Sequence, residues 1–337
     1  MRTKTLLAAA IATAVGLGAA AVQAEPVKIR LSYVVPVGNW AGYIYHKKDM
    51  MKHYGKSYVA TSTRFKGTTF MITAMGAGEL EIANLAYSSF AIAVQNAGMD
   101  DLRVIADDIQ QGIHGYDAGS YYVLKDGPIK TVKDLKGSVM ASVGPGTAVD
   151  IAIRAMMKKN GLEDKRDYKI VTASFPSMRA MLLQKKAALV PNVHPFDLHP
   201  EFKAKARVLF TNVDALNGPT QFIIYAARES WLKKNRAAVV DCLEDMIRAA
   251  HWWSDPKNYD EGRGILAGIV KVPKKRMAYK FTKDDFYKDP NLMPNVEALQ
   301  REVDLQHDLG FLPRKMDVSK YVDLSYLKEA AARVNGK

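Results

Sequence analysis

Residues 138–161 read SVMASVGPGTAVDIAIRAMMKKNG, and this stretch decides the fold class. It begins with Ser138–Ser142, a short, largely apolar run of the length of a strand. After a Gly-Pro-Gly turn, Thr147–Asn160 places small and apolar residues three and four positions apart, which predicts an amphipathic helix that Gly161 ends. A strand that leads through a tight turn into a helix is half of a βαβ unit, from which parallel sheets are built.

The same alternation of strand and helix runs along the chain as far as residue 227. Strands separated by single helices predict mainly parallel sheets and an α/β fold. From Ser230 onward the pattern changes to a long amphipathic helix and further helical segments interrupted by prolines. The predicted strands are 27–35, 58–64, 82–85, 102–106, 121–124, 138–142, 168–172, 188–190, 207–210 and 221–227, and the predicted helices up to residue 227 are 40–51, 67–77, 88–97, 147–160 and 176–186.

Two short segments, 119–124 and 221–226, are strand-like and rich in Tyr, Phe and Ile. Paired extended crossings of this kind join two lobes and form a hinge between them. We therefore predict lobe I from residues 25–120 and 222–337, and lobe II from residues 121–221.

The first residues have the pattern of a signal peptide. Arg2 and Lys4 precede an apolar, Ala-rich stretch from Leu6 to Val22, and small residues lead to Ala24. We predict cleavage after Ala24 and export to the periplasm. No later run approaches the length of a membrane span.

Composition narrows the class of protein further. Hydrophobic residues make up 48% of the 337 residues, which is ample for a large core, and the single cysteine excludes an internal disulfide. The formal net charge is +13. Because the basic residues are dispersed rather than clustered in a long run, we predict a solvated basic surface with a mild preference for anionic ligands, and no nucleic-acid partner.

Several markers follow one another in a fixed order. They are GNWAG at 38–42, AGELEIA at 77–83 followed by AYSS, KDLKG at 133–137 and GPGT at 144–147. By their order and spacing the chain after residue 24 resembles the sulfonate-, nitrate-, taurine- and thiamine-precursor-binding proteins of bacterial ABC importers. The resemblance implies a type II periplasmic-binding fold, with two lobes joined by a two-crossing hinge. The chain departs from that family at residues 190–196, VPNVHPF, where an Asp-Ala pair often precedes a Trp or Glu, and this indicates a different ligand.

Four turns lie where an open parallel sheet binds its ligands, beyond the carboxyl ends of strands. They are residues 38–40, 65–68, 87–89 and 144–147. Each leads into a predicted helix, and the N-terminus of a helix favours anions. We therefore expect an anionic or strongly accepting group of the ligand near Ser88, Gly146 and Thr147. Any one such turn is also consistent with an ordinary helix start.

Trp40 is the candidate for the apolar part of the ligand, because an aromatic ring offers a rigid wall. The alternative is a tryptophan that fills the core of its lobe. Asn39 precedes it at the same strand end, and Tyr87 has the same two interpretations. Ser88 and Ser89 offer hydroxyl and N–H donors to a ligand, or only cap a helix.

His194, Asp197 and His199 lie close together on a proline-rich loop. Their spacing matches no recognised zinc pattern, so we predict no metal site and place His194 at the rim of the cleft. Arg64 and Arg179 are candidates for pairing with an anionic ligand, or for surface ion pairs.

The sequence contains no Gly-x-Ser-x-Gly elbow, no His-Glu-x-x-His motif and no Walker loop, and Cys242 lies in a predicted amphipathic helix. We therefore predict no enzymatic activity and no cofactor. The prediction is a periplasmic, monomeric solute-binding protein that delivers a sulfonate, carboxylate or pyrimidine-type solute to an ABC importer permease. Two alternatives remain, an enzyme similar to thiamine-pyrimidine synthases, whose cysteine-rich motif this chain lacks, and an exported ligand sensor.

Overall fold

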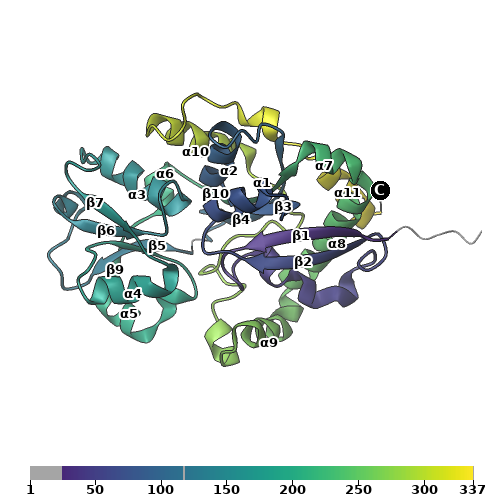
Figure 1. The fold of residues 1–337 in the computed structure, drawn as a ribbon. Coiled ribbons are helices and arrows are strands. Elements are labelled where there is room, and N and C mark those ends of the chain that lie inside the picture. Colours follow the sequence, from purple (N-terminus) through teal and green to yellow (C-terminus); the bar gives the residue numbers. More distant parts are fainter. Residues whose placement is uncertain (1–24, 117, 337) are drawn as a thin grey trace, which may run out of the picture.

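The structure is a computed structural model that describes residues 25–116 and 118–336. Figure 1 shows two sheets, each with its own helices, side by side in an elongated molecule. We call the larger sheet with its helices lobe I and the other lobe II. The predicted α/β fold is confirmed, whereas the predicted signal peptide, residues 1–24, lies outside the described residues.

The sheet of lobe I has the strand order β2-β1-β3-β10-β4. β1 pairs in parallel with β2 and β3, whereas β10 pairs antiparallel with β3 and β4. Four of these five strands therefore run in one direction, and β10, which returns from lobe II, opposes them. The strands are β1 Val27–Tyr33, β2 Tyr58–Arg64, β3 Ile82–Ala86, β4 Leu102–Gln111 and β10 Thr220–Arg228.

The sheet of lobe II repeats this arrangement. Its strands form the groups β8-β5-β9 and β6-β7, which a bridge between Met140 and Leu189 connects. β5, which enters from lobe I, runs antiparallel to both of its neighbours. Each crossing strand therefore opposes the other strands of the lobe that it enters. The strands are β5 Ser120–Leu124, β6 Val139–Ser142, β7 Lys169–Thr172, β8 Val190–Asn192 and β9 Ala206–Thr211.

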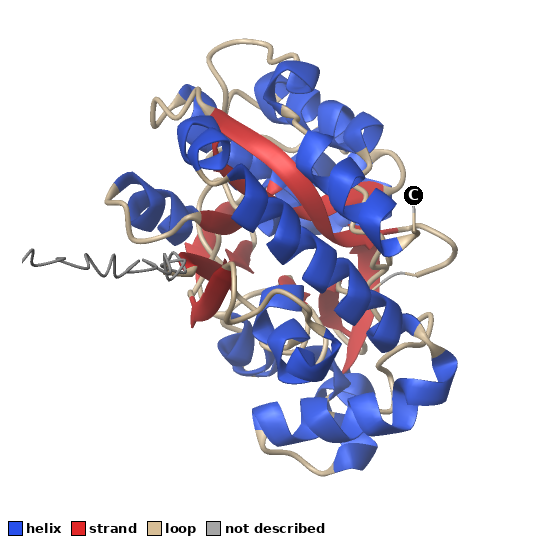
Figure 2. Ribbon diagram, turned by 90° about the vertical axis from the view of Figure 1, so that its right-hand side faces the viewer, coloured by secondary structure: helices blue, strands red, loops and turns tan. Residues whose placement is uncertain are grey.

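Helices surround both sheets (Figure 2). Among the described residues, none is both long and apolar enough to cross a membrane. The α-helices are α1 Thr69–Gly76, α2 Tyr87–Gln95, α3 Ala148–Lys159, α4 Phe175–Leu183, α5 Pro200–Lys205, α6 Asn212–Leu216, α7 Glu229–Lys234, α8 Arg236–Ser254, α9 Tyr259–Val270, α10 Val296–Asp308 and α11 Ser325–Val334, and the 3-10 helices are η1 Trp40–Gly42, η2 Ile44–Met50, η3 Val132–Leu135, η4 Phe196–Leu198, η5 Pro256–Asn258, η6 Lys274–Met277 and η7 Val318–Tyr321.

Two predicted elements differ from the structure. The predicted helix at 40–51 is a pair of short 3-10 helices, η1 and η2, with a further kink at Lys47. The predicted strand at 102–106 continues through Gln111, because the charged residues Asp107 and Asp108 are buried within β4 rather than ending it.

The two crossings between the lobes are tied together by one buried amide. Gln111 Nε2 donates to the carbonyl of Ala118 in the first crossing (2.5 Å), and Gln111 Oε1 accepts from Asn212 Nδ2 near the second (2.6 Å). The hydroxyl of Tyr121 donates to Asn212 Oδ1 (2.6 Å). Because a buried amide without partners is costly, these bonds hold the crossings next to each other.

The lobes are in direct contact beyond the crossings. One buried apolar cluster includes Phe90 of α2 in lobe I and Ile151 of α3 in lobe II. Across the same interface, the hydroxyl of Tyr87 donates to the carbonyl of Ala148 (3.3 Å). The two lobes therefore pack against each other in this structure.

Candidate functional site

A cavity of about 60 Å³ lies between the lobes. Its walls are the residues that follow β1, β2, β6 and β8, the end of β3 and the helix starts after them. This is the position at which open parallel sheets bind ligands. The lining residues are Val34, Val35, Asn39, Lys66, Gly67, Thr68, Ala86, Ile109, Val143, Thr147, Ala148, Val149, Phe175, Val193, Phe222, Ile223 and Phe286.

The lining of this cavity is mainly apolar. Phe222 and Phe286 stack with their ring centroids 6.3 Å apart, and Phe175 at the start of α4 contributes a third ring. Polar side chains are few, chiefly those of Asn39, Thr68 and Thr147, with the exposed Lys66. Such a surface favours an apolar or aromatic part of a ligand, because burying a polar group without partners is costly.

The wall from lobe I is held by Asn39. Its Oδ1 accepts from the backbone N–H groups of Val34 (3.1 Å) and Val35 (2.8 Å), directly after β1. Its Nδ2 donates to Asp108 Oδ2 (2.7 Å). The amide thus fixes the loop that lines the cavity, and these hydrogen bonds make Asn39 a positioning residue in this structure.

Asp108 is the centre of a buried polar network behind that loop. Its Oδ1 accepts from the N–H of Trp40 (2.7 Å) and from Lys288 Nζ (3.2 Å), and its Oδ2 also accepts from Asn84 Nδ2 (2.9 Å). Burial lowers the pKa of Lys288, while the nearby carboxylates oppose that change. The network connects β1, β3 and β4 to the segment that carries Phe286.

Asp107, beside it, lies in a different environment. Gln221 Nε2 donates to its Oδ1 (2.7 Å), and the N–H of Asp289 donates to its Oδ2 (3.3 Å). Burial nevertheless raises the pKa of Asp107 to about 7. Asp107 and Asp108 are thus adjacent in β4, but only Asp108 forms an ion pair, with Lys288.

The wall from lobe II is the turn before α3. Thr147 lines the cavity, and its hydroxyl donates to the carbonyl of Gly144 (2.7 Å). Asp150 Oδ2 accepts from the N–H of Gly146 (3.0 Å) and from Arg154 Nε (2.9 Å). A carboxylate of the protein therefore already occupies this helix N-terminus, and it weakens the attraction that we expected there for a ligand anion.

The structure places some of the predicted site residues in the wall of the cavity and others away from it. Asn39 and Thr147 line the cavity, and Ser89 lies one step behind it, with its hydroxyl 2.6 Å from that of Thr68. Ser88 and Tyr87 are fully buried in α2 and do not line it. Gly146 lies at the interface, where an added Cβ would be 2.8 Å from Ile92 Cδ1 of lobe I.

Trp40 packs in the core of lobe I in this structure. It is 1% exposed, its ring lies 5.1 Å from that of Tyr43, and Lys288 Nζ lies 4.8 Å from its centroid. It does not line the cavity, and with Trp253 and Phe281 it lines a separate pocket of about 290 Å³. Of the two interpretations of the sequence, the arrangement favours core packing, and ligand stacking on Trp40 stays a prediction.

His194 is also largely buried. Its Nδ1 lies 2.7 Å from Asp197 Oδ1, and its ring meets that of Tyr279 from lobe I edge-on, with centroids 4.9 Å apart. Its neighbour Val193 lines the cavity, whereas Pro195 and Tyr279 line a larger groove outside it. His194 therefore lies between the two spaces.

This outer groove has a volume of about 1170 Å³. It runs between the start of α4, η4 and α5 in lobe II and the segment from the end of α9 through η6 in lobe I. Both arginines considered from the sequence line it: Arg64 Nε donates to the carbonyl of Val34 (3.2 Å), and Arg179 pairs with Glu201 (2.8 Å).

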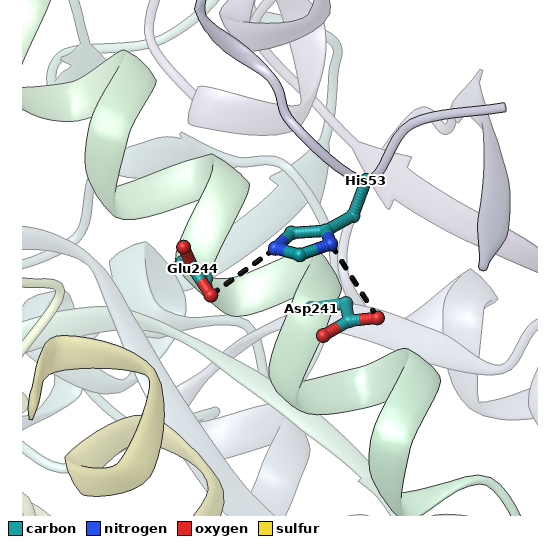
Figure 3. A group of neighbouring side chains, drawn as sticks. All are labelled: His53, Asp241 and Glu244. Atoms are coloured by element: carbon teal, nitrogen blue, oxygen red, sulfur yellow. Dashed lines mark hydrogen bonds and ion pairs between the residues drawn. The ribbon is translucent and has the colours of Figure 1, made fainter. Parts of the chain in front are cut away.

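Within the described part of the chain, one group of side chains has the spacing of a metal site: His53, Asp241 and Glu244, with one ligand atom of each within 4.8 Å of the others. Figure 3 shows the imidazole between the two carboxylates, with Nε2 3.2 Å from Glu244 and Nδ1 3.7 Å from Asp241. Arg333 lies 2.9 Å from Asp241, and Arg248 lies 2.8 Å from Glu244. Because each carboxylate already has a cationic partner and the two nitrogens face opposite ways, we interpret the group as an ion-pair network.

Cys242 is fully buried in α8, with its sulfur 3.4 Å from the hydroxyl of Tyr45. Burial raises the pKa of its thiol to about 12. The thiolate is the reactive form, so this cysteine does not serve as a nucleophile at neutral pH.

Sequence reasoning missed the residues that organise the site. Asp108 and Gln111 belong to the stretch DDIQQ at 107–111, which follows an apolar strand directly. Four polar residues in one strand could have indicated a buried polar network, because polar groups in a buried strand must have hydrogen-bond partners. Phe222 and Phe286 carry no such signal, since their roles depend on contacts between distant segments.

The chain is similar in sequence and in fold to known proteins. Residues 22–267 match the NMT1-like family. No curated protein sequence matches the chain.

Solved structures with the same fold include three binding proteins. The alkanesulfonate-binding protein SsuA from Xanthomonas axonopodis pv. citri, bound to MOPS, has a TM-score of 0.69 at 17% identity, over 89% of this chain and 99% of that one. The periplasmic aliphatic sulphonate binding protein SsuA from Escherichia coli has a TM-score of 0.67 at 18% identity, over 88% and 92%. The periplasmic nitrate-binding protein NrtA from Synechocystis PCC 6803 has a TM-score of 0.67 at 17% identity, over 93% and 90%. At these identities the similarity shows the fold.

Proposed function

Because this chain belongs to the NMT1-like family, we propose that it is the periplasmic solute-binding component of an ABC importer. It captures a small organic anion or an aromatic or heterocyclic solute, of sulfonate, carboxylate or pyrimidine type, by closure of its two lobes. Lobe I comprises residues 25–120 and 222–337, and lobe II comprises 121–221. The leader is removed after Ala24, and the monomer delivers its solute to the permease without a cofactor.

The observation that carries this proposal is a cavity divided between the lobes. Asn39 and Thr68 line it from lobe I, whereas Thr147 and Phe175 line it from lobe II. A ligand that contacts both walls stabilises the closed arrangement over an open one, and this couples binding to a change of shape. The solved binding proteins with the same fold carry sulfonates and nitrate according to their descriptions, which agrees with a small solute.

The crossings support the movement that closure requires. In the described part of the chain, the segments between β4 and β5 and between β9 and β10 connect the sheets, and hydrogen bonds of the Gln111 amide hold them side by side. A pair of adjacent extended segments bends more easily than a packed helical interface, so the lobes rotate about this point.

A thermal-shift screen of alkanesulfonates, aromatic carboxylates and pyrimidines tests the proposal. We expect a compound of these classes to raise the melting temperature and to reduce the radius of gyration in X-ray scattering. Phe222→Ala removes part of the cavity wall and is expected to weaken binding of the best compound about tenfold, which corresponds to about 1.4 kcal/mol. Phe70→Ala is the matched control, because Phe70 is 54% exposed and lies outside the cavity. Tight binding without compaction, or equal losses in both variants, would contradict the proposal.

A further inference from the structure

The outer groove and the inner cavity lie next to each other between the lobes. Phe175 lines both spaces, and Val35, which lines the cavity, is followed by Pro36, which lines the groove. In Figure 1, α4, α5 and α9 lie on the lower side of the molecule, and residues from these helices line the groove. Because the groove and the cavity share Phe175 as a wall, we call the groove the mouth of the cavity.

The mouth is strongly basic. Six arginine and lysine side chains line it, from β2, α4, α5 and the segment after α9, against a single aspartate, Asp284. Within the described residues, only Arg179 of the six forms an ion pair, and the other five are exposed. These five are Arg64, Lys203, Lys271, Lys275 and Arg276.

Unpaired cations that converge on one groove from two lobes repel each other in the closed form. Lys203 belongs to lobe II, whereas Lys271, Lys275 and Arg276 belong to lobe I. Closure brings these like charges together and therefore costs free energy unless an anion lies between them. A ligand with two negative charges reduces this repulsion more than a ligand with one.

The inner cavity excludes such a group. Its lining is mainly apolar, and Asp150 already occupies the helix N-terminus beside Thr147. A carboxylate buried there without partners would lose its hydration. The volume of about 60 Å³ is also smaller than the cavity of about 150 Å³ that holds benzene in another protein, so it takes only the end of an apolar group in this closed form.

From these observations, and resting on the proposed function, we infer that the solute is an amphipathic organic anion with at least two acidic groups. Its apolar end lies in the inner cavity beside Phe222 and Phe286, and its acidic end lies in the basic mouth. Phe175, which lines both spaces, marks the boundary between the two parts.

A matched series of probes tests this orientation. Benzylmalonate carries a benzyl group and two carboxylates, 3-phenylpropionate lacks one carboxylate, 3-phenylpropanamide has no charge, and methylmalonate lacks the ring. Calorimetry is expected to give the tightest binding for benzylmalonate, and at least a tenfold loss for both the amide and methylmalonate. Raising the salt concentration should weaken the binding of benzylmalonate and leave the binding of the amide unchanged.

Charge reversal in the mouth provides the second arm. The double variant Lys275→Glu/Arg276→Glu is expected to weaken benzylmalonate about tenfold or more, since each exposed charge contributes a factor of about two to five and is here inverted. Lys328→Glu on α11 is the control, because Lys328 is also exposed and without an ion pair but lies outside the groove. Thermal melts confirm that the variants fold.

The inference is overturned if the amide binds as tightly as the diacid, if none of the four probes binds, or if the double variant and the control lose the same affinity. The proposed function is tested separately by the compound screen. A sulfonate or pyrimidine that compacts the protein while the diacid fails would leave the proposed function standing and refute only the orientation.

Discussion

Replacing Gly146 by alanine should selectively disfavour the closed arrangement of the lobes. Gly146 has φ +70, and a Cβ at this position would lie 2.8 Å from Ile92 Cδ1 across the interface. Two costs arise and act on different states. The left-handed backbone costs about 1–2 kcal/mol for a residue with a Cβ, whether the lobes are open or closed. The contact with Ile92 exists only when they are closed.

The contact with Ile92 sets how strongly Gly146→Ala disfavours the closed arrangement. Because Ile92 Cδ1 is the far end of a flexible side chain, it can move aside at the cost of a distorted rotamer, about 0.5–1.5 kcal/mol. A change of about 1 kcal/mol reduces the ratio of closed to open molecules about fivefold. Affinity for a solute that binds only the closed form falls by the same factor.

Gly161→Ala is a close control, because Gly161 has φ +76 at the end of α3 and an added Cβ would meet nothing within 4 Å. Both variants should lose similar stability in urea, whereas only Gly146→Ala should show a larger radius of gyration in X-ray scattering. Adding Ile92→Ala to Gly146→Ala should restore the smaller radius. Equal radii for the two glycine variants, or no restoration, would refute the steric argument.

Three further outcomes follow from the buried network and the leader. Asp108→Ala should destabilise folding by about 3–5 kcal/mol in urea, because it leaves Lys288 buried without that partner. The free energy of unfolding should fall as the pH rises from about 4 to about 7, because burial raises the pKa of Asp107 to about 7 and the folded chain holds a proton that the unfolded chain has released. Asp107→Asn should flatten this slope in urea titrations between about pH 5 and pH 8, and an unchanged slope would count against it. Mass spectrometry of the periplasmic fraction should find an N-terminus at Glu25, whereas a cytoplasmic protein that retains Met1 would contradict export.

The elements that sequence alone predicts well are those whose pattern is local. The unit from β6 to α3 is fixed by an apolar strand, a glycine turn and a helical period, and its observed bounds differ from the predicted ones by one residue at each end. Residues 40–51 were predicted as one helix, whereas the structure has two short 3-10 helices there, η1 and η2. The side-chain oxygen of Asn39 accepts hydrogen bonds from the backbone N–H groups of residues 34 and 35, and the short 3-10 helix η1 follows directly.

The buried charges of β4 show why the rest could not be predicted. Asp107 and Asp108 end the apolar pattern of their strand, and a pattern of this kind predicts a loop. Their partners lie at residues 84, 221 and 288, which are distant in the sequence, and only the fold brings them together. Trp40 illustrates the same limit, because a tryptophan at a strand end can face the cleft or the core, and here Tyr43 and Lys288 surround it.

The division of the interlobe space into two environments has a physical consequence for recognition. Charges at the mouth act over distances of about 8 Å at physiological ionic strength, so they attract anions of many kinds before any contact is made. The apolar lining acts only at contact and selects by shape and surface. Because five cations without an ion pair line the mouth, an anion without a fitting apolar end reduces their repulsion but leaves the wall at Phe222 without a partner. A neutral apolar molecule contacts the wall at Phe222 but leaves the repulsion between the cations unchanged. Full closure is therefore expected only when one molecule binds both the basic mouth and the apolar cavity. The closed shape then indicates that the bound molecule has both an anionic and an apolar end.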